Sequence, residues 1–386
     1  MCSDERNRYD LIKYARVHSP EISLLPESYK EFFGPDKNLC NADEWINAYR
    51  KDKGGIITVD VRSEAEFAED HLPGAVNFPI LDNIERDEVG FLYKQVSPKA
   101  ALYRALGAAG SKAEMIRDFC SGMSGKDIFV YCWRGGGRSS AACKYFSDYV
   151  KNCIKIEDGY KAYRREIFRL FYEDPSELNF VVLSGLTGCG KTEIIEHMTG
   201  KVPVFDIEKA AGHASSLFGH IRYEVKTSDI PQSQLQFENR LFEQVISNNN
   251  KGLPFLTESE SKRISKFNIP DALHKRLLDS PLIEIASSMD NRIRRIVQEY
   301  FSDGSERVYS TLKNSEFLKK ILGREKTSGL LKMLDEGEVY KFCEWFLTEY
   351  YDKRYSGKYK NRVGEISNDD TNKAAFEIEE YLKKML

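Results

Sequence analysis

The stretch that decides the fold reads Phe180-Val-Val-Leu-Ser-Gly185-Leu-Thr-Gly-Cys-Gly-Lys191-Thr192. Its first four residues form a short apolar run, which predicts a buried strand. The last eight match the phosphate-loop pattern G-x-x-x-x-G-K-[ST], and the helical stretch TEIIEHM overlaps its end. Backbone N–H groups in such a loop face a phosphate, the lysine reaches the terminal phosphate, and the threonine hydroxyl reaches Mg²⁺. We therefore expect an α/β phosphate-loop domain whose phosphate-binding residues are Gly185, Thr187, Gly188, Cys189, Gly190, Lys191 and Thr192. Within this set Cys189 reads as a small spacer rather than a nucleophile.

Two acidic pairs follow apolar runs downstream of this loop. Asp206 and Glu208 end VPVFDIE, and Glu258 and Glu260 follow GLPFLT. Phosphate loops usually have an acidic partner at the end of a neighbouring strand that helps to hold Mg²⁺. Either pair could orient a metal ion or a substrate. Alternatively, these carboxylates are simply exposed to solvent at the ends of the strands. As Mg²⁺ ligands we take Thr192, Asp206 and Glu258.

The rest of the chain predicts a second α/β domain before this one and helices after it. The runs Ile56–Val61 and Ile128–Tyr131, together with NCIKIEDG, predict strands that alternate with helices, which indicates a mainly parallel sheet. Pro175 lies in a linker, FYEDPSELNF. PLIEIAS predicts a further strand, and DNRIRRIVQEYF and KAAFEIEEYLKKML predict helices with one apolar face. We expect an N-terminal extension over 1–50, an α/β domain over 51–175, and a phosphate-loop domain with a helical C-terminal region over 176–386.

Composition excludes several classes of protein. The 386 residues are 41% hydrophobic and 30% charged, with 57 basic and 60 acidic residues and a net charge of −3. No stretch approaches the roughly 18 apolar residues of a membrane helix, and the first residues do not resemble a signal peptide. We therefore expect a cytoplasmic protein without a membrane partner. None of the eight cysteines forms a C-x-x-C pair, so we expect reduced thiols and no structural zinc site.

One cysteine lies in a distinctive loop, Tyr131-Cys132-Trp-Arg-Gly-Gly-Gly-Arg138-Ser139. A strand leads into Cys132, glycines follow, and a helix begins near Ser139. Converging N–H groups, the start of the helix and Arg138 would form an anion nest that favours thiolate over thiol. We therefore take Cys132 and Arg138 as the catalytic pair. The spacing C-x5-R is also that of cysteine-dependent phosphatases, although Tyr131 rather than histidine precedes the cysteine.

Residues upstream of the cysteine loop distinguish a phosphatase from a protein that transfers sulfur or selenium. The segment D60-V-R-S-E-A-E-F-A-E-D-H-L-P-G-A-V-N-F-P79 resembles the N-terminal signature of rhodanese (sulfurtransferase) domains, which implies that Cys132 carries a chalcogen. A rhodanese domain followed by a phosphate-loop domain resembles the tRNA 2-selenouridine synthase family over nearly the whole chain from about residue 55. Further segments that carry this resemblance include N83-I-E-R-D-E-V-G-F-L-Y-K94, D158-G-Y-K-A-Y-R164, D206-I-E-K-A-A-G-H-A-S-S-L-F-G219 and Y350-Y-D-K-R-Y355. The resemblance implies a rhodanese-like parallel-sheet domain followed by a P-loop NTPase-like α/β domain with a helical C-terminal end.

The resemblance also implies a two-step reaction on the wobble 2-thiouridine of tRNA. Geranyl diphosphate first alkylates the sulfur, and selenium from selenophosphate then replaces the S-geranyl group, leaving 2-selenouridine. The two co-substrates would bind at the phosphate loop, with Mg²⁺, and at Cys132. The enzyme that produces selenophosphate is a candidate partner.

Binding of tRNA requires local positive charge, because the chain as a whole is slightly acidic. The tract K353-R-Y-S-G-K-Y-K-N-R362 interleaves basic and aromatic residues, as suits phosphate contacts and base stacking. Two other basic groups lie after the cysteine loop and in the helix that contains Arg292, Arg294 and Arg295. As tRNA-binding residues we take Lys161, Arg164, Lys353, Arg354, Lys358, Lys360 and Arg362. Each group could also be a solvated charged face.

Two other classes of function compete with this one. A small-molecule kinase with a regulatory rhodanese domain would transfer phosphate without needing Cys132. A nucleotide-gated RNA-binding module would bind tRNA without changing the nucleoside.

Overall fold

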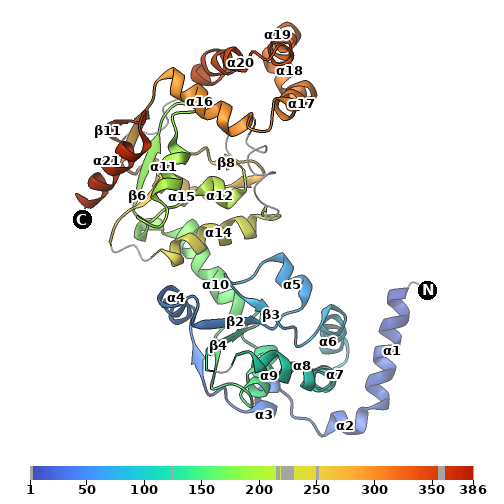
Figure 1. Cartoon of the computed structure of the whole chain (residues 1–386). Helices are drawn as coiled ribbons and strands as arrows, with labels where there is room; N and C mark the ends of the chain where they lie inside the picture. Colours follow the sequence, from blue (N-terminus) through green and yellow to red (C-terminus); the bar gives the residue numbers. More distant parts are fainter. Residues whose placement is uncertain are drawn as a thin grey trace. The chain divides into compact units, whose positions relative to one another are not determined.

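The structure, a computed structural model, describes residues 3–123, 125–213, 218, 230–248, 252–354 and 361–385, with side chains from residue 8 onward. The chain forms two compact units, Met1–Ile167 and Phe168–Leu386 (Figure 1). The boundary predicted from the sequence, after residue 175, lies eight residues later. Helix α10 (Gly159–Phe168) continues directly as the π-helix η1 (Arg169–Glu173), which packs against α15 (Asp271–Leu278) of the second unit. Among the described residues, no helix is long and apolar enough to cross a membrane.

The first unit contains a five-stranded parallel sheet in the order β1-β5-β4-β2-β3. The strands are β1 (Leu39–Cys40), β2 (Ile56–Asp60), β3 (Val76–Asn77), β4 (Asp127–Tyr131) and β5 (Asn152–Ile156). The three long strands are those that the apolar runs predict. Its other helices are α1 (Ser3–Val17), α2 (Ser19–Ser23), α3 (Tyr29–Phe33), α4 (Ala42–Lys51), α5 (Glu64–Glu69), α6 (Asn83–Gln95), α7 (Pro98–Gly110), α8 (Ala113–Ser121) and α9 (Gly137–Phe146). Sequence analysis placed β1 and α4 in an N-terminal extension. In the structure β1 is an edge strand of the sheet and α4 packs on one of its faces.

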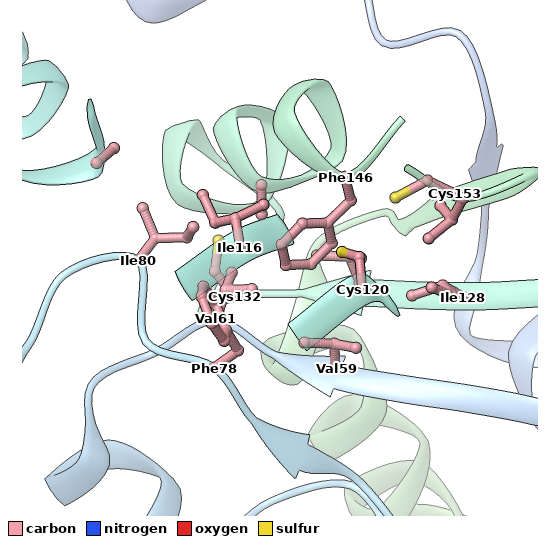
Figure 2. Close-up of a cluster of buried hydrophobic side chains, with 14 of the residues drawn as sticks. Val59, Val61, Phe78, Ile80, Ile116, Cys120, Ile128, Cys132, Phe146 and Cys153 are labelled. Carbon is pink, nitrogen blue, oxygen red and sulfur yellow. The ribbon is translucent and has the colours of Figure 1, made fainter. Parts of the chain in front are cut away.

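Helices cover both faces of this sheet (Figure 1). On one face the buried Trp45 of α4 donates a hydrogen bond from its indole N–H to Thr58 Oγ1 over 3.0 Å and contacts Tyr163 of α10 edge-on. On the other face, Val59 and Val130 pack with apolar residues of α7, α8 and α9. Figure 2 shows this second cluster, which includes Cys132 immediately after β4. The core therefore extends to the base of the cysteine loop.

The second unit contains a four-stranded parallel sheet in the order β11-β10-β6-β7. Its strands are β6 (Phe180–Ser184), β7 (Phe255–Glu258), β10 (Leu282–Ala286) and β11 (Arg362–Ser367), and a small hairpin is formed by β8 (Arg263–Ile264) and β9 (Phe267–Asn268). The strand predicted in VPVFDIE is reduced to a single bridge between Val204 and Leu256, because α12 (Ile207–Ala211) begins within that segment. Strand β11 was not predicted.

Helices pack on the second sheet and extend beyond it (Figure 1). The helix α11 (Lys191–Met198) and the C-terminal α21 (Thr371–Lys383) share one apolar cluster with the strands. A separate cluster holds the helical region together. The helices and turns not yet given are η2 (Pro175–Glu177), α14 (Gln234–Ser247), α16 (Met289–Tyr300), α17 (Glu306–Asn314), α18 (Glu316–Leu322), α19 (Arg324–Asp335), α20 (Val339–Trp345), η3 (Phe346–Tyr351) and η4 (Asp352–Arg354).

Candidate functional site

The phosphate loop lies between β6 and α11, as its motif predicts. All of β6 is buried, so the strand holds the start of the loop in the core. Gly190 adopts the left-handed conformation, with φ of +85°, where the loop turns into α11. The Nζ of Lys191 donates a hydrogen bond to the backbone oxygen of Gly185 over 2.8 Å and so crosses the loop. The structure therefore brings together the seven residues predicted to bind phosphate.

Three residues from distant segments brace this loop. Asn368, after β11, donates from Nδ2 to the backbone oxygens of Cys189 and Gly190 over 2.9 and 3.3 Å. Arg292 donates from Nε to the backbone oxygen of Thr187 over 2.8 Å, and its guanidinium forms a bidentate pair with Asp352.

Arg295 forms an ion pair with Glu193 of α11 at 2.7 Å and donates to the backbone oxygen of Asn368 over 2.6 Å. Sequence analysis grouped Arg292 and Arg295 as a basic patch for tRNA. The structure contradicts this for Arg292, which is buried and holds the loop. The local sequence carries no signal for these contacts, because the partners are separated by 60 residues or more.

Three buried carboxylates gather beside the loop. Oxygens of Glu208, Glu258 and Glu260 lie within 4.8 Å of one another. Burial, and then the charge of Glu208, raises the pKa of Glu258 to about 8, and Oε1 of Glu258 has no hydrogen-bond partner among the described atoms. Asp206 is not in this group, and its side chain caps α12 by accepting from the backbone N–H of Lys209 over 2.8 Å.

This acidic cluster fits a divalent cation. Carboxylate and hydroxyl oxygens are the ligands that Mg²⁺ prefers, and a buried, unpartnered carboxylate oxygen is costly without a cation or a proton. Glu258 also hydrogen-bonds to Thr192, which links the cluster to the phosphate loop. Of the predicted ligands, Thr192 and Glu258 lie together, and Glu208 and Glu260 join them in place of Asp206.

Charges around Lys191 keep its ammonium group protonated. Burial alone would lower the pKa of Lys191, but nearby Cys189 and the carboxylates of the cluster raise it above its ordinary value. A polar cavity of about 370 Å³ opens beside the loop and is lined by Lys191 and Thr192 together with residues of α16 and the turn that follows it. The site therefore offers a fixed positive charge next to space for a ligand.

The cysteine loop in the first unit places a buried thiol at the start of a helix. Cys132 follows β4 and is 3% exposed. Its Sγ accepts a hydrogen bond from the backbone N–H of Gly136 over 3.2 Å and lies 3.3 Å from Oγ of Ser139, in the first turn of α9. The sulfur therefore lies next to two polar groups at the N-terminal end of a helix. Ser139 was not selected from the sequence, where serines at a helix start are common.

Arg138 is paired within the site. Its guanidinium binds the carboxylate of Glu66 through two hydrogen bonds of 2.5 and 3.1 Å. Burial raises the pKa of Glu66, but the pairing with Arg138 outweighs it and lowers the pKa overall. Arg138 therefore positions the loop by fixing α9 to α5, and its positive charge is shared with Glu66.

The N-terminal segment contributes a residue to this loop that sequence analysis did not identify. The ring of Tyr29, in α3, packs on the loop so closely that a Cβ on Gly137 would lie 3.2 Å from Tyr29 Cγ. Burial raises the pKa of Tyr29, and the nearby Cys132 raises it further despite the opposing effect of Lys30. The phenol therefore stays protonated beside Cys132.

The residues predicted to bind tRNA lie in different settings. Lys161 is exposed on α10, where Arg164 is half-buried. Lys353 pairs with Glu349 at 2.5 Å, and Arg354 stacks over the ring of Tyr350 at 4.0 Å. Arg362 begins β11 and pairs with Glu284 and Glu365. Lys358 and Lys360 lie outside the described residues. Exposed ion pairs contribute little, so these cations remain able to contact phosphate.

Comparisons with known proteins match both units. Residues 178–385 match the family model "tRNA 2-selenouridine synthase AAA domain", and residues 43–166 match "Rhodanese-like domain". A tRNA 2-selenouridine synthase of Pseudomonas syringae pv. syringae is 29% identical over 355 residues, which cover 83% of this chain and 94% of the relative. One from Pseudomonas putida KT2440 is 28% identical over 361 residues, covering 85% and 94%. Among solved structures, the N-terminal domain of a putative ATP/GTP binding protein from Clostridium difficile is 30% identical, with a TM-score of 0.30, over 34% of this chain and 98% of that one.

Proposed function

The chain belongs to the tRNA 2-selenouridine synthase family, and on that premise we propose that it converts wobble 2-thiouridine to 2-selenouridine through an S-geranyl intermediate. The family membership makes it a tRNA-modifying transferase. The proposal adds the two co-substrates, geranyl diphosphate and selenophosphate, and a site for each. The alternative as a kinase is disfavoured because 83% of the chain aligns with a tRNA 2-selenouridine synthase and the first unit matches the rhodanese family model.

In the first step the C2 sulfur of 2-thiouridine attacks C1 of geranyl diphosphate. A C–S bond forms, the C–O bond to diphosphate breaks, and the nucleobase loses its N3 proton. Diphosphate leaves readily only when its charge is neutralised. The N–H groups of residues 185–190 and the ammonium of Lys191 supply this neutralisation.

Glu208, Glu258, Glu260 and Thr192 would hold Mg²⁺ beside the diphosphate. When bound, the ion adds positive charge where the leaving group develops negative charge. The residues themselves do two things: Thr192 fixes Glu258 through their hydrogen bond, and Lys191 spans the loop from Gly185.

In the second step, selenium of selenophosphate attacks C2, and the C2–S bond breaks. Geranylthiol leaves, water cleaves the P–Se bond, phosphate is released, and N3 regains its proton. The N–H groups of the cysteine loop hold the selenophosphate anion, and the thiolate of Cys132 takes the proton from the Se–H group and passes it to the departing geranylthiolate. Glu66 and Arg138 position the loop, and the enzyme that produces selenophosphate is the partner we propose for supplying it.

One observation supports the proposal: the chain has two separate loops that end at helix N-termini, which matches the two anionic co-substrates we propose. The loop over 185–192 ends at a helix N-terminus next to a buried carboxylate cluster, which suits a diphosphate with a metal ion. The loop over 132–138 ends at another helix N-terminus next to a buried thiol, which suits a selenium donor.

Nucleoside mass spectrometry tests the proposal directly. Thiolated tRNA is incubated with the protein and with geranyl diphosphate, selenophosphate, both or neither. We expect S-geranyl-2-thiouridine with geranyl diphosphate alone and 2-selenouridine only with both. Phosphorylated small molecules without any change in the nucleoside would identify a kinase, and binding of tRNA without any change would identify a binding module.

A further inference from the structure

A large cavity opens beside Cys132 within the first unit. Its volume is about 680 Å³, and Cys132, Trp133 and Arg134 of the cysteine loop form part of its lining. Pockets of this size bind small organic ligands. A selenophosphate ion is small, so it would leave most of this volume available to a second ligand group.

Apolar side chains from one face of α7 form another part of the lining. They recur at helical spacing and comprise Ala101, Leu102, Ala105, Leu106 and Ala109. Phe33, Ile80, Leu81 and Val89 from neighbouring elements complete this apolar wall. Leu102, Ala105 and Leu106 are only half-buried, so their apolar surface faces the cavity rather than being sealed in the core. The wall therefore suits a flexible hydrocarbon.

We infer that this cavity binds the ten-carbon geranyl chain while the modified nucleoside reacts at Cys132. An apolar cavity of about 150 Å³ holds benzene, so ten carbons need roughly 250 Å³, which this cavity exceeds. The inference rests on the proposed function, because that function supplies a geranylated substrate to the cysteine loop.

The charges in the lining favour the geranylated nucleoside over geranyl diphosphate as the source of the chain. The lining contains three carboxylates, of Glu27, Glu66 and Glu69, and three guanidinium groups, of Arg86, Arg134 and Arg138, so their formal charges cancel. Arg86 and Arg138 both pair with Glu66, and only Arg134 has no ion-pair or hydrogen-bond partner among the described side chains. A neutral wall with one uncommitted cation suits a single small anion at the loop and disfavours a diphosphate.

The test uses a variant with a narrower cavity and RNA substrates whose S-alkyl groups differ in length. Ala105→Trp fills the space beside α7, and Ala113→Trp is a matched control because Ala113 is exposed on α8 and does not line the cavity. Selenation is measured on anticodon stem-loop RNA that carries S-geranyl- or S-dimethylallyl-2-thiouridine. We expect Ala105→Trp to lower kcat/KM at least tenfold for the ten-carbon chain and less than twofold for the five-carbon chain. Ala113→Trp should match wild type on both.

A second variant, which enlarges the cavity, controls for misfolding. A separate measurement of geranylation shows whether the geranyl group in the cavity belongs to the nucleoside or to geranyl diphosphate. Leu106→Ala widens the cavity and should increase selenation of RNA carrying the fifteen-carbon S-farnesyl group. Equal losses on both chain lengths, or no loss, would overturn the inference. An equal loss in the formation of S-geranyl-2-thiouridine from geranyl diphosphate would assign the cavity to that co-substrate instead and would also overturn it.

A binding measurement separates failure of this inference from failure of the proposed function. Calorimetry on the full chain compares S-geranyl-2-thiouridine with 2-thiouridine as free nucleosides. We expect the geranylated nucleoside to bind at least tenfold more tightly to wild type and to lose this advantage in Ala105→Trp. If wild type binds the geranylated nucleoside more tightly and Ala105→Trp does not, but no selenation occurs, the proposed reaction is wrong and the cavity assignment stands. Equal affinity of wild type for both nucleosides would overturn the assignment itself.

Discussion

Replacing Gly190 with alanine should damage the phosphate loop in two separable ways. The first is backbone strain, since φ is +85° and a non-glycine residue in the left-handed region costs roughly 1–2 kcal/mol. The second is a clash, because the new Cβ would lie 2.3 Å from Nδ2 of Asn368 and 2.8 Å from Nε of Arg295. Overpacking of this kind costs roughly 1–3 kcal/mol. Together these costs lower the free energy of unfolding by about 2–5 kcal/mol. The clash also displaces Asn368 and Arg295, which brace the loop.

Gly200 provides the matched control. Its φ is +83°, but a Cβ there would meet no atom within 4 Å. Gly200→Ala therefore isolates the strain, and urea unfolding should show Gly190→Ala to be less stable than Gly200→Ala by about 1–3 kcal/mol. Formation of S-geranyl-2-thiouridine, followed by mass spectrometry, should fall at least tenfold in Gly190→Ala only. Equal stabilities of the two variants together with wild-type geranylation would refute the bracing role assigned to Asn368 and Arg295.

Three further predictions concern the two loops and the basic tract. Lys191→Ala should abolish geranylation but leave the unfolding midpoint near that of wild type, because Nζ contacts the loop and not the core; an unchanged geranylation rate would remove the loop from the diphosphate site. Cys132→Ser should block selenation and accumulate S-geranyl-2-thiouridine, since serine stays protonated at neutral pH, whereas Cys143→Ser should behave as wild type; full selenation by Cys132→Ser would contradict the role of the thiolate. Serine at all five basic positions of 353–362 should weaken tRNA binding and flatten the slope of log affinity against log salt by about 0.9 per lost phosphate contact; an unchanged slope would mean that the tract is only a solvated face.

Features encoded in adjacent residues were predictable from the sequence. The strand before the phosphate loop is a continuous apolar run because both of its faces are buried, so the run alone indicates it. The same holds for the strand before Cys132. In each case the motif that follows the strand marks the turn into a helix.

Features that depend on tertiary contacts were not predictable. Strand β11 lies at the sheet edge, where its residues are exposed or only half-buried, so its sequence has no apolar run. Sequence analysis used only its first residue, Arg362, as the end of the basic tract. Tyr29 reaches the cysteine loop from a segment with no motif of its own. Both acidic pairs were candidates for binding the cation. Asp206 instead caps the start of α12, and this tertiary detail leaves Glu208 as the member of its pair that joins the carboxylate cluster.

The brace between Asn368 and Cys189 also sets an order for events during synthesis. The two residues are separated by 179 positions, and ribosomes add roughly 5–20 residues per second, so about 9–36 seconds pass between them. The rhodanese unit, which ends at Ile167, is complete in the nascent chain before that interval begins. The phosphate loop, in contrast, waits for β11 to emerge and pair beside β10. A chain that ends before residue 368 therefore has a finished rhodanese unit and a phosphate loop that lacks the Asn368 brace, although Arg292 still donates to Thr187.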